Sequence, residues 1–232
     1  MGEQVILDGD PPIELVLNRS SRARRLSLRV SRLDGRVTLT LPRGASRRHA
    51  LAFAEEKAGW IRRQLAGRPD EARPMPGAVL PYRGVETPIV THTARAVRHT
   101  GAAIAVPAHD PDRTPARLAA FLKLQARDAL AEASARHAAA LGRAHGRITL
   151  RDTRSRWGSC SSKGDLMYSW RLIMAPAEVL DYVAAHEVAH LAEMNHSPAF
   201  WAVVGDLFPG YEAPRRWLHE NAPRLHRYRF RD

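Results

Sequence analysis

A helical pattern in the last third of the chain places two histidines four residues apart. The pattern starts near Pro176, and its apolar face is formed by Val179, Leu180, Val183 and Leu191. His186 and His190 lie on one side of such a helix, one turn apart, so both imidazoles can reach one ion. Glu187 projects beside them, where it can accept a proton from a metal-activated water. The segment therefore predicts a zinc-dependent hydrolase site with Glu187 as general base.

A third protein ligand is needed, and the sequence offers several. His196 lies six residues beyond His190, so a continuous helix would carry it to the far side. We therefore expect the helix to end between them, with Asn195 in left-handed geometry and Ser197-Pro198 starting a new helix. His196 is favoured as the third ligand of a single zinc ion per chain. The competing ligands are Glu193, on the same helical face, and the more distant Glu212 and Glu220.

The charge of the chain is its compositional outlier. Lysine and arginine number 36 against 24 acidic residues, and only three of the basic residues are lysines. The arginines crowd two regions: Arg19, Arg22, Arg24, Arg25 and Arg29; and Arg215, Arg216, Arg224, Arg227, Arg229 and Arg231. The second region is interleaved with aromatic residues, a mixture suited to contact with DNA or a nucleotide. A solvated basic surface explains the same residues.

Several classes of protein are disfavoured by the same sequence. The lone Cys160 excludes an internal disulfide and fits a reducing compartment. No apolar run approaches the roughly 18 residues of a membrane span, and residues 1–12 do not resemble a signal peptide. We expect a cytoplasmic protein without membrane contact, whose oligomeric state the sequence leaves open.

The order of expected elements indicates an α+β fold. Strands are predicted at Ile13–Leu17, Arg25–Val30 and Arg36–Leu41, followed by one helix that starts after Ser46. Three more strands are predicted at 78–82, 86–91 and 102–106, and Thr114-Pro115 begins an alanine-rich helix. We expect a β-rich module over residues 1–110, with one inserted helix, and a mainly helical zincin-like catalytic module with a small sheet over residues 111–232.

Three blocks of the sequence form a specific combination. They are Arg156-Trp157-Gly158-Ser159-Cys160-Ser161-Ser162-Lys163-Gly164 with Trp170-Arg171-Leu172, the histidine helix, and Asn195-His196-Ser197-Pro198-Ala199-Phe200-Trp201. Together these blocks resemble the YgjP-like family of zinc metallopeptidases, which is related to the SprT-like and WLM metallopeptidases. Weaker similarity extends upstream through Arg25–Val30, so the resemblance covers most of the chain. It implies zinc ligands at His186, His190 and His196, and a peptide or protein substrate. Unlike some other zinc peptidases, the chain has no glycine between its second and third histidines.

Residues around the helix are candidates for binding substrate. By the resemblance, the strand Asp165–Leu172 lines the cleft and pairs with the substrate backbone. The substrate-binding candidates are Arg156, Tyr168, Trp170 and Arg171. Donors for the developing oxyanion are sought among Arg156, Tyr168, Arg171 and His219.

Two other functions stay open at this point. Metal-activated water also attacks phosphorus, so a nucleoside triphosphate phosphoanhydride is an alternative substrate for the same site. A basic nucleic-acid-binding protein with a structural zinc is the third hypothesis, but a structural site has no use for Glu187.

Overall fold

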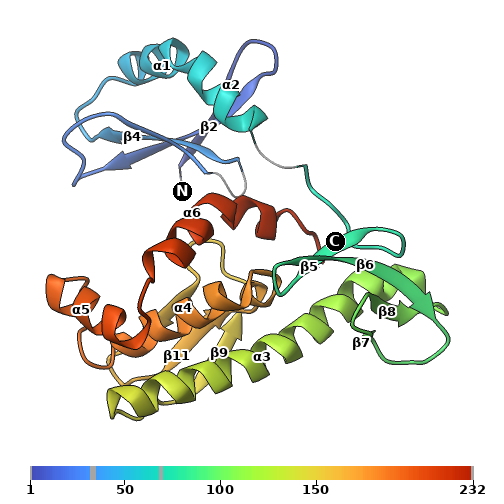
Figure 1. The fold of residues 1–232 in the computed structure, drawn as a ribbon. Coiled ribbons are helices and arrows are strands. Elements are labelled where there is room, and N and C mark those ends of the chain that lie inside the picture. Colours follow the sequence, from blue (N-terminus) through green and yellow to red (C-terminus); the bar gives the residue numbers. More distant parts are fainter. Residues whose placement is uncertain (1, 32–34, 68–69, 231–232) are drawn as a thin grey trace. The chain divides into compact units, whose positions relative to one another are not determined.

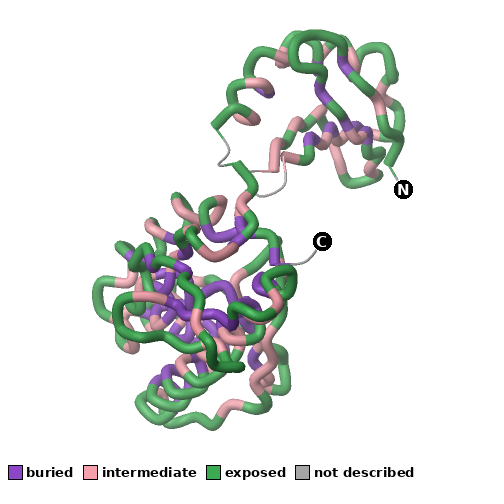
Figure 2. The backbone as a smooth tube through the Cα atoms, turned by 90° about the vertical axis from the view of Figure 1, so that its right-hand side faces the viewer, coloured by how far each residue is buried: buried purple, intermediate pink, exposed green. Residues whose placement is uncertain are grey.

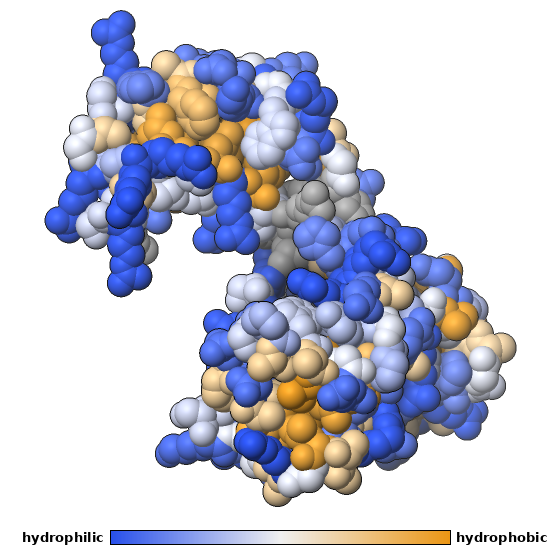
Figure 3. All heavy atoms as spheres, turned by 60° about the vertical axis from the view of Figure 1, so that its left-hand side comes forward, coloured by the Kyte–Doolittle hydropathy of each residue, from blue (hydrophilic) through white to orange (hydrophobic). Residues whose placement is uncertain are grey.

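The computed structural model describes residues 2–31, 35–67 and 70–230. Its contacts divide the chain into two compact units, Met1–Asp70 and Glu71–Asp232. Figure 2 shows that buried residues gather in a separate core within each unit. Figure 3 shows faces of both units that are largely hydrophilic, with a smaller hydrophobic area on each.

The first unit is a four-stranded sheet with two helices. Its strands are β1 (Glu3–Leu7), β2 (Ile13–Ser20), β3 (Ser27–Val30) and β4 (Val37–Pro42), in the order β1-β2-β4-β3 (Figure 1). The β2–β4 pair is parallel and the other two pairs are antiparallel. Alternate residues of β2 and β4 are buried, which is the period-2 pattern of a sheet with one covered face.

Two short helices of this unit complete its core. The predicted single helix is instead α1 (Arg47–Glu56) followed by α2 (Ala58–Ala66), because the backbone leaves helical geometry at Lys57. Ala50, Ala54 and Ile61 are the buried helical residues in the core against the sheet. The predicted strands agree with β2, β3 and β4, and β1 was missed.

The second unit begins with another four-stranded sheet. Its strands are β5 (Val79–Tyr82), β6 (Val85–His92), β7 (Arg98–His99) and β8 (Ile104–Pro107), in the order β5-β6-β8-β7. A 3-10 turn, η1 (Pro111–Arg113), leads into the long helix α3 (Thr114–Leu141). Leu80, Ile89 and Ile104 share one core with residues of α3. The division by contacts therefore differs from the expected boundary near residue 110, because these strands pack on the helix that follows them.

The rest of the second unit surrounds the histidine helix. A three-stranded sheet of order β10-β11-β9 contains β9 (Ile148–Arg151), β10 (Gly158–Cys160) and β11 (Leu166–Ser169). The 3-10 helix η2 (Trp170–Met174) connects it to α4 (Ala177–Ala189), followed by α5 (Pro198–Leu207) and α6 (Glu212–His226). Helices α3 and α4 pack side by side (Figure 1), and the overall class is α+β, as expected.

A polar contact joins α3 to α4 within this packing. Oδ1 of Asp181 lies 2.6 Å from Nε2 of the buried His137 and 2.6 Å from Nη2 of Arg136. Burial raises the pKa of Asp181, but the hydrogen bonds and charges of His137 and Arg136 outweigh it, so the pKa is lowered overall. None of the described helices has a stretch long and apolar enough to cross a membrane.

Candidate metal and catalytic site

Helix α4 carries the first two histidines at its C-terminal end. His186 is half-buried inside the last turn, and the buried His190 forms the C-cap just beyond Ala189. The two ring centroids lie 5.2 Å apart. The helix ends here as predicted, because the N–H groups of Leu191 and Ala192 bond to carbonyls three residues back, which tightens the last turn.

The segment after α4 turns the chain back toward the helix. Asn195 was expected in left-handed geometry, and that expectation is wrong: Arg83 is the described non-glycine residue with positive φ. Instead, Oδ1 of Asn195 accepts a hydrogen bond from the N–H of Ser197 at 3.0 Å, an Asx turn. Ser197 caps α5 by accepting from the N–H of Phe200 at 3.4 Å, with Pro198 in the first turn, as predicted.

This turn brings three imidazoles together. The ligand atoms of His186, His190 and His196 all lie within 4.8 Å of one another, and the Nε2 atoms of His186 and His196 are 3.1 Å apart. Nδ1 of His190 donates to the carbonyl of Glu193 at 2.9 Å, which leaves its Nε2 lone pair free. Glu193 thus contributes its backbone carbonyl to the site. Among the described residues, its carboxylate is not part of the group of side chains that could bind one ion.

The protonation of two of these histidines suits a metal ligand. Burial lowers the pKa of His186 to about 3, with smaller contributions from His190, His196 and Arg215. Burial also lowers the pKa of His190. Both rings are therefore neutral at neutral pH, and neutral imidazole is the form that binds a metal. The donor set, three nitrogens converging from a helix and the following turn, fits a divalent cation such as zinc.

Glu187 lies against the backbone of the neighbouring strand β10. A Cβ atom built on Gly158 would come within 2.6 Å of Cγ and 2.7 Å of Cδ of Glu187. A real Cβ does not approach other atoms so closely, so only glycine leaves room for the carboxyl group here. The glycine of the Trp157-Gly158-Ser159-Cys160 block thereby sets the position of Glu187.

The electrostatics of Glu187 are those of a buried acid. Its side chain is buried, and this burial raises its pKa to about 8, while the charge of Arg156 acts in the opposite direction. Arg156 is exposed and directly precedes Trp157 and β10. A cation held by the adjacent histidines would favour the ionised carboxylate in the same way as Arg156 does.

The strand that was expected to pair with the substrate has no unpaired edge. β11 is the central strand of its sheet, antiparallel to β10 on one side and parallel to β9 on the other. Its backbone groups are therefore already paired, which corrects the expectation for Asp165–Leu172. β10 and β9 are the two edge strands of this sheet among the described residues, and β10 packs against α4.

Two of the substrate-binding candidates lie in the core. Tyr168 is 0% exposed and Trp170 is 1% exposed. The hydroxyl of Tyr168 lies 2.9 Å from that of Ser134 on α3, and Trp170 packs edge-on to Phe230. Neither side chain can contact a substrate in this structure, because both are buried in the core. Their expected role in substrate binding is corrected accordingly.

The third candidate, Arg171, is a buried link to the end of α6. Nε and Nη2 bond to the two carboxylate oxygens of Asp152 at 2.7 and 3.3 Å. Nη1 donates to the carbonyls of Leu225 and Tyr228 at 2.9 and 3.1 Å. Its donors are used within the protein, so Arg171 holds the C-terminal segment in place and does not meet substrate. Arg156 is thus the substrate-binding candidate that the structure leaves exposed.

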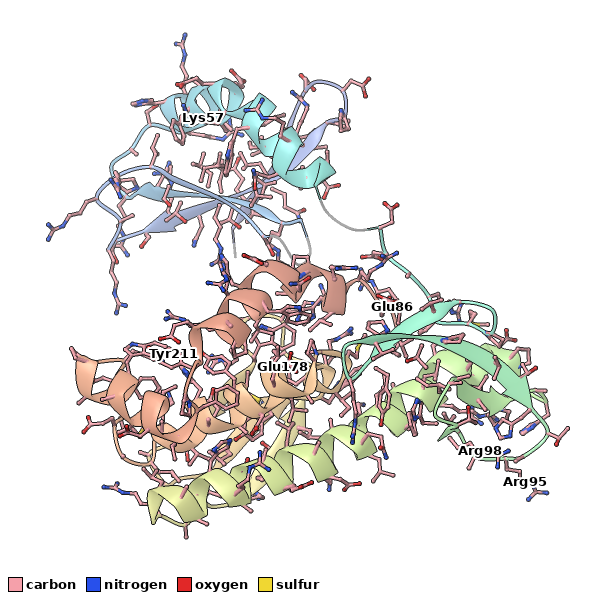
Figure 4. All side chains as sticks on the ribbon, viewed as in Figure 1. Lys57, Glu86, Arg95, Arg98, Glu178 and Tyr211 are labelled. Carbon is pink, nitrogen blue, oxygen red and sulfur yellow. The ribbon has the colours of Figure 1, made fainter. Side chains whose placement is uncertain are left out.

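An aromatic group packs beside the histidines. The ring of Trp201 on α5 lies 5.7 Å from that of His186 and stacks on Tyr211, at 5.3 Å. Tyr211, labelled in Figure 4, also stacks on Tyr182 of α4. The guanidinium of Arg215 lies 4.3 Å from the centroid of the Trp201 ring. Arg215 belongs to the C-terminal arginine cluster that the sequence analysis described. Its contact with Trp201 of α5 could not be predicted from the sequence.

Several arginines of the two clusters serve internal contacts. Nη1 of Arg19 donates to the carbonyls of Arg43 and Ala45, at 2.8 and 3.1 Å. Arg229 forms an ion pair with Glu71. Arg231 lies outside the described residues. Arg19 and Arg229 are therefore engaged within the protein.

A known protein family matches most of the chain. A family model described as YgjP-like, metallopeptidase domain, matches residues 24–221. Among solved structures the chain is similar to the metallopeptidase zymogen abylysin of Pyrococcus abyssi, with 22% identity, 41% of this chain and 93% of that chain covered, and a TM-score of 0.34. No curated protein matches. The family match spans both compact units and includes the three histidines and Glu187, and the chain therefore belongs to the YgjP-like metallopeptidase family.

Proposed function

We propose that the chain is a zinc-dependent peptidase in which His186, His190 and His196 hold one zinc ion and Glu187 is the general base. Membership of a metallopeptidase family makes it a peptidase with a divalent metal and a peptide or protein substrate. The observation that carries the finer proposal is the convergence of three imidazoles beside a buried carboxylate. Zinc bound there would polarise the scissile carbonyl and make the attacking water more acidic.

The residues of the chain have separate tasks in this mechanism. Glu187 would accept the proton of the attacking water and pass it to the leaving amine. Burial makes its carboxylate a stronger proton acceptor than an exposed one, and Gly158 fixes where it stands. The carbonyl of Glu193 orients the ring of His190. Of the sequence candidates for an oxyanion donor, Arg156 and His219 are exposed, whereas Tyr168 and Arg171 are buried.

The open edge of β10 suits an extended peptide. A substrate strand paired with β10 would lie alongside the residues that follow Trp157, and Gly158 of this strand contacts Glu187. Main-chain hydrogen bonds of this kind hold a peptide without reading its sequence. Such pairing would bring a backbone carbonyl close to the three histidines, as peptide hydrolysis requires.

Metal content and peptide cleavage, measured on the same preparations, test the proposal. The wild type should bind about one zinc per chain by elemental mass spectrometry, and His196→Ala should lose most of it. Glu187→Gln keeps the size of the side chain and should retain the metal while cleavage falls by at least about 10²-fold. Undiminished zinc in His196→Ala would refute the ligand set, and undiminished cleavage by Glu187→Gln would refute the general base.

The same preparations separate the alternative substrates. If the protein hydrolysed a nucleoside triphosphate and cleaved no peptide in a mixed library, phosphoanhydride hydrolysis would be the function of this site and the proposed peptidase activity would be refuted. Binding of DNA with a steep dependence on salt, and no hydrolysis, would favour a structural zinc. Neither result is expected. The family is one of metallopeptidases, which favours a peptide over a phosphoanhydride, and a structural site has no use for a base held against β10 beside the histidines.

A further inference from the structure

A cavity of about 600 Å³ opens in the second unit beside the candidate site. Its wall is formed mainly by α6, with one residue from α4 and one from the segment before β10. The lining residues used below are Trp157, Tyr182, Glu212, Arg215, Arg216 and His219. This volume is in the range of sites that enclose a side chain or a small ligand.

The cavity adjoins the catalytic residues at two points. Tyr182 lies one helical turn before His186 on α4, and the two rings are 5.9 Å apart. Trp157 directly precedes Gly158, whose backbone contacts Glu187. A peptide that follows the edge of β10 past Glu187 therefore passes the mouth of this cavity.

Two arginines on its wall have no anionic partner among the residues that the structure describes. Arg215 and Arg216 are both exposed, and within residues 2–31, 35–67 and 70–230 neither guanidinium forms an ion pair or a hydrogen bond. Glu212, which also lines the cavity, pairs with neither of them. Arg215 is nevertheless held in place, because it lies over the ring of Trp201. Its donors are thus positioned and unused, in contrast to those of Arg171.

We propose that this cavity is the subsite for a substrate residue that flanks the scissile bond, and that it selects a carboxylate. The proposal rests on the peptidase function proposed above. An arginine guanidinium binds a carboxylate through two parallel hydrogen bonds, and a cation already fixed over an aromatic ring loses little freedom on binding. The rings of Trp157 and Tyr182 offer apolar walls to the methylene groups of a glutamate side chain.

The proposed peptide substrate favours a carboxylate over a phosphate as the occupant. Both anions suit an arginine guanidinium, but carboxylates are the anionic groups that an unmodified peptide carries. The carboxylate can come from an aspartate or glutamate side chain or from the C-terminus of a short peptide. Both have the same chemistry, and the experiment below separates them.

Matched peptides test the proposal. Zinc-loaded wild type is assayed on peptides that differ only by glutamate, glutamine or lysine at each position flanking the cleaved bond, and on a C-terminal acid and its amide. We expect kcat/KM to favour glutamate over glutamine, or the acid over the amide, by about 10- to 100-fold, as for a hydrogen bond to a charged group. The first preference identifies a side-chain carboxylate, and the second identifies the C-terminus.

Three variants assign the preference to the cavity. Arg215→Gln combined with Arg216→Gln should bring the glutamate-to-glutamine ratio close to one, and Arg215→Glu should turn the preference toward lysine. Arg224→Gln is the matched control, since Arg224 is an exposed arginine on the same helix outside this lining, and it should keep the wild-type ratio.

The possible failures are distinguishable. Equal kcat/KM for all peptides in the wild type, or a preference that survives loss of both arginines, would overturn the carboxylate subsite. The proposed peptidase function would still stand if cleavage depended on Glu187. Inhibition of cleavage by inorganic triphosphate that depends on Arg215, with no carboxylate preference, would assign the cavity to phosphate and overturn the proposal. Absence of cleavage of every peptide would overturn the peptidase function and this inference together.

Discussion

Replacing Gly158 by alanine tests how closely β10 controls the catalytic carboxyl group. The added Cβ would stand 2.6 Å from Cγ of Glu187, whereas unstrained carbon atoms pack at roughly 3.5 Å. The side chain of Glu187 must therefore retreat by about 1 Å. A misplacement of about 1 Å in a catalytic group costs on the order of 10²-fold in rate, which corresponds to about 2.7 kcal/mol in the barrier.

We expect Gly158→Ala to lower kcat/KM for peptide cleavage by about 10²-fold while the zinc content stays near one per chain, because the three histidines are untouched. The steric conflict should also lower the free energy of unfolding by about 1–3 kcal/mol. Steady-state kinetics, elemental mass spectrometry and denaturant unfolding measure these three quantities.

Gly146→Ala is the matched control for this substitution. A Cβ built there would lie 2.5 Å from Oδ1 of Asp165, so it meets a carboxylate just as tightly, but away from the histidines and Glu187. It should show a similar loss of stability with little loss of activity. Wild-type kcat/KM in a fully metal-loaded Gly158→Ala variant would refute the reasoning, and so would equal activity losses in the two variants.

Other substitutions probe the supports of the site. Arg171→Ala should lower the free energy of unfolding by about 2–4 kcal/mol in denaturant titration, because it removes a buried cation that binds the end of α6; a loss below about 0.5 kcal/mol would contradict this role. The pKa of Asp181 is lowered by its partners, so its carboxylate stabilises the fold above the unfolded pKa of about 3.9, and this stability is lost as the pH falls through the folded value. The stability gap between wild type and Asp181→Asn should accordingly shrink below about pH 4, and a gap that widens in acid would show the opposite linkage. Asn195→Ala, which loses the acceptor for Ser197, should weaken zinc affinity by about 10-fold in a competition titration, whereas Asn195→Asp should not; equal affinity in both would exclude the turn as a support of His196.

The metal-binding side of the site was predictable because it is built from local sequence. Residues four apart on a helix share a face whatever the rest of the fold does, so the convergence of His186 and His190 required only the helix. Its end before His196, and the cap formed by Ser197-Pro198, also follow from short-range preferences of individual residues. The left-handed residue expected at Asn195 failed because a side-chain hydrogen bond to the backbone achieves the same reversal without positive φ.

The substrate-facing side depended on long-range pairing, which the sequence did not determine. β11 has strand neighbours on both edges because β9, from an earlier part of the chain, pairs with it in parallel, and nothing local to Asp165–Leu172 signals this partner. Tyrosine and arginine are common in active sites. Here, however, the hydroxyl of Tyr168 bonds to that of Ser134 on α3, and Arg171 donates to the carbonyls of Leu225 and Tyr228.

The sequence by itself determined that His186 and His190 share one face of a helix, the α+β class and the resemblance to the family. The tertiary structure decided which strand edge is open, that Gly158 contacts Glu187, and that Arg215 stands beside the histidines with no anionic partner among the described residues. The reason is physical: helical periodicity, capping and turns depend on residues a few positions apart, whereas burial and edge exposure depend on which distant segments close the core.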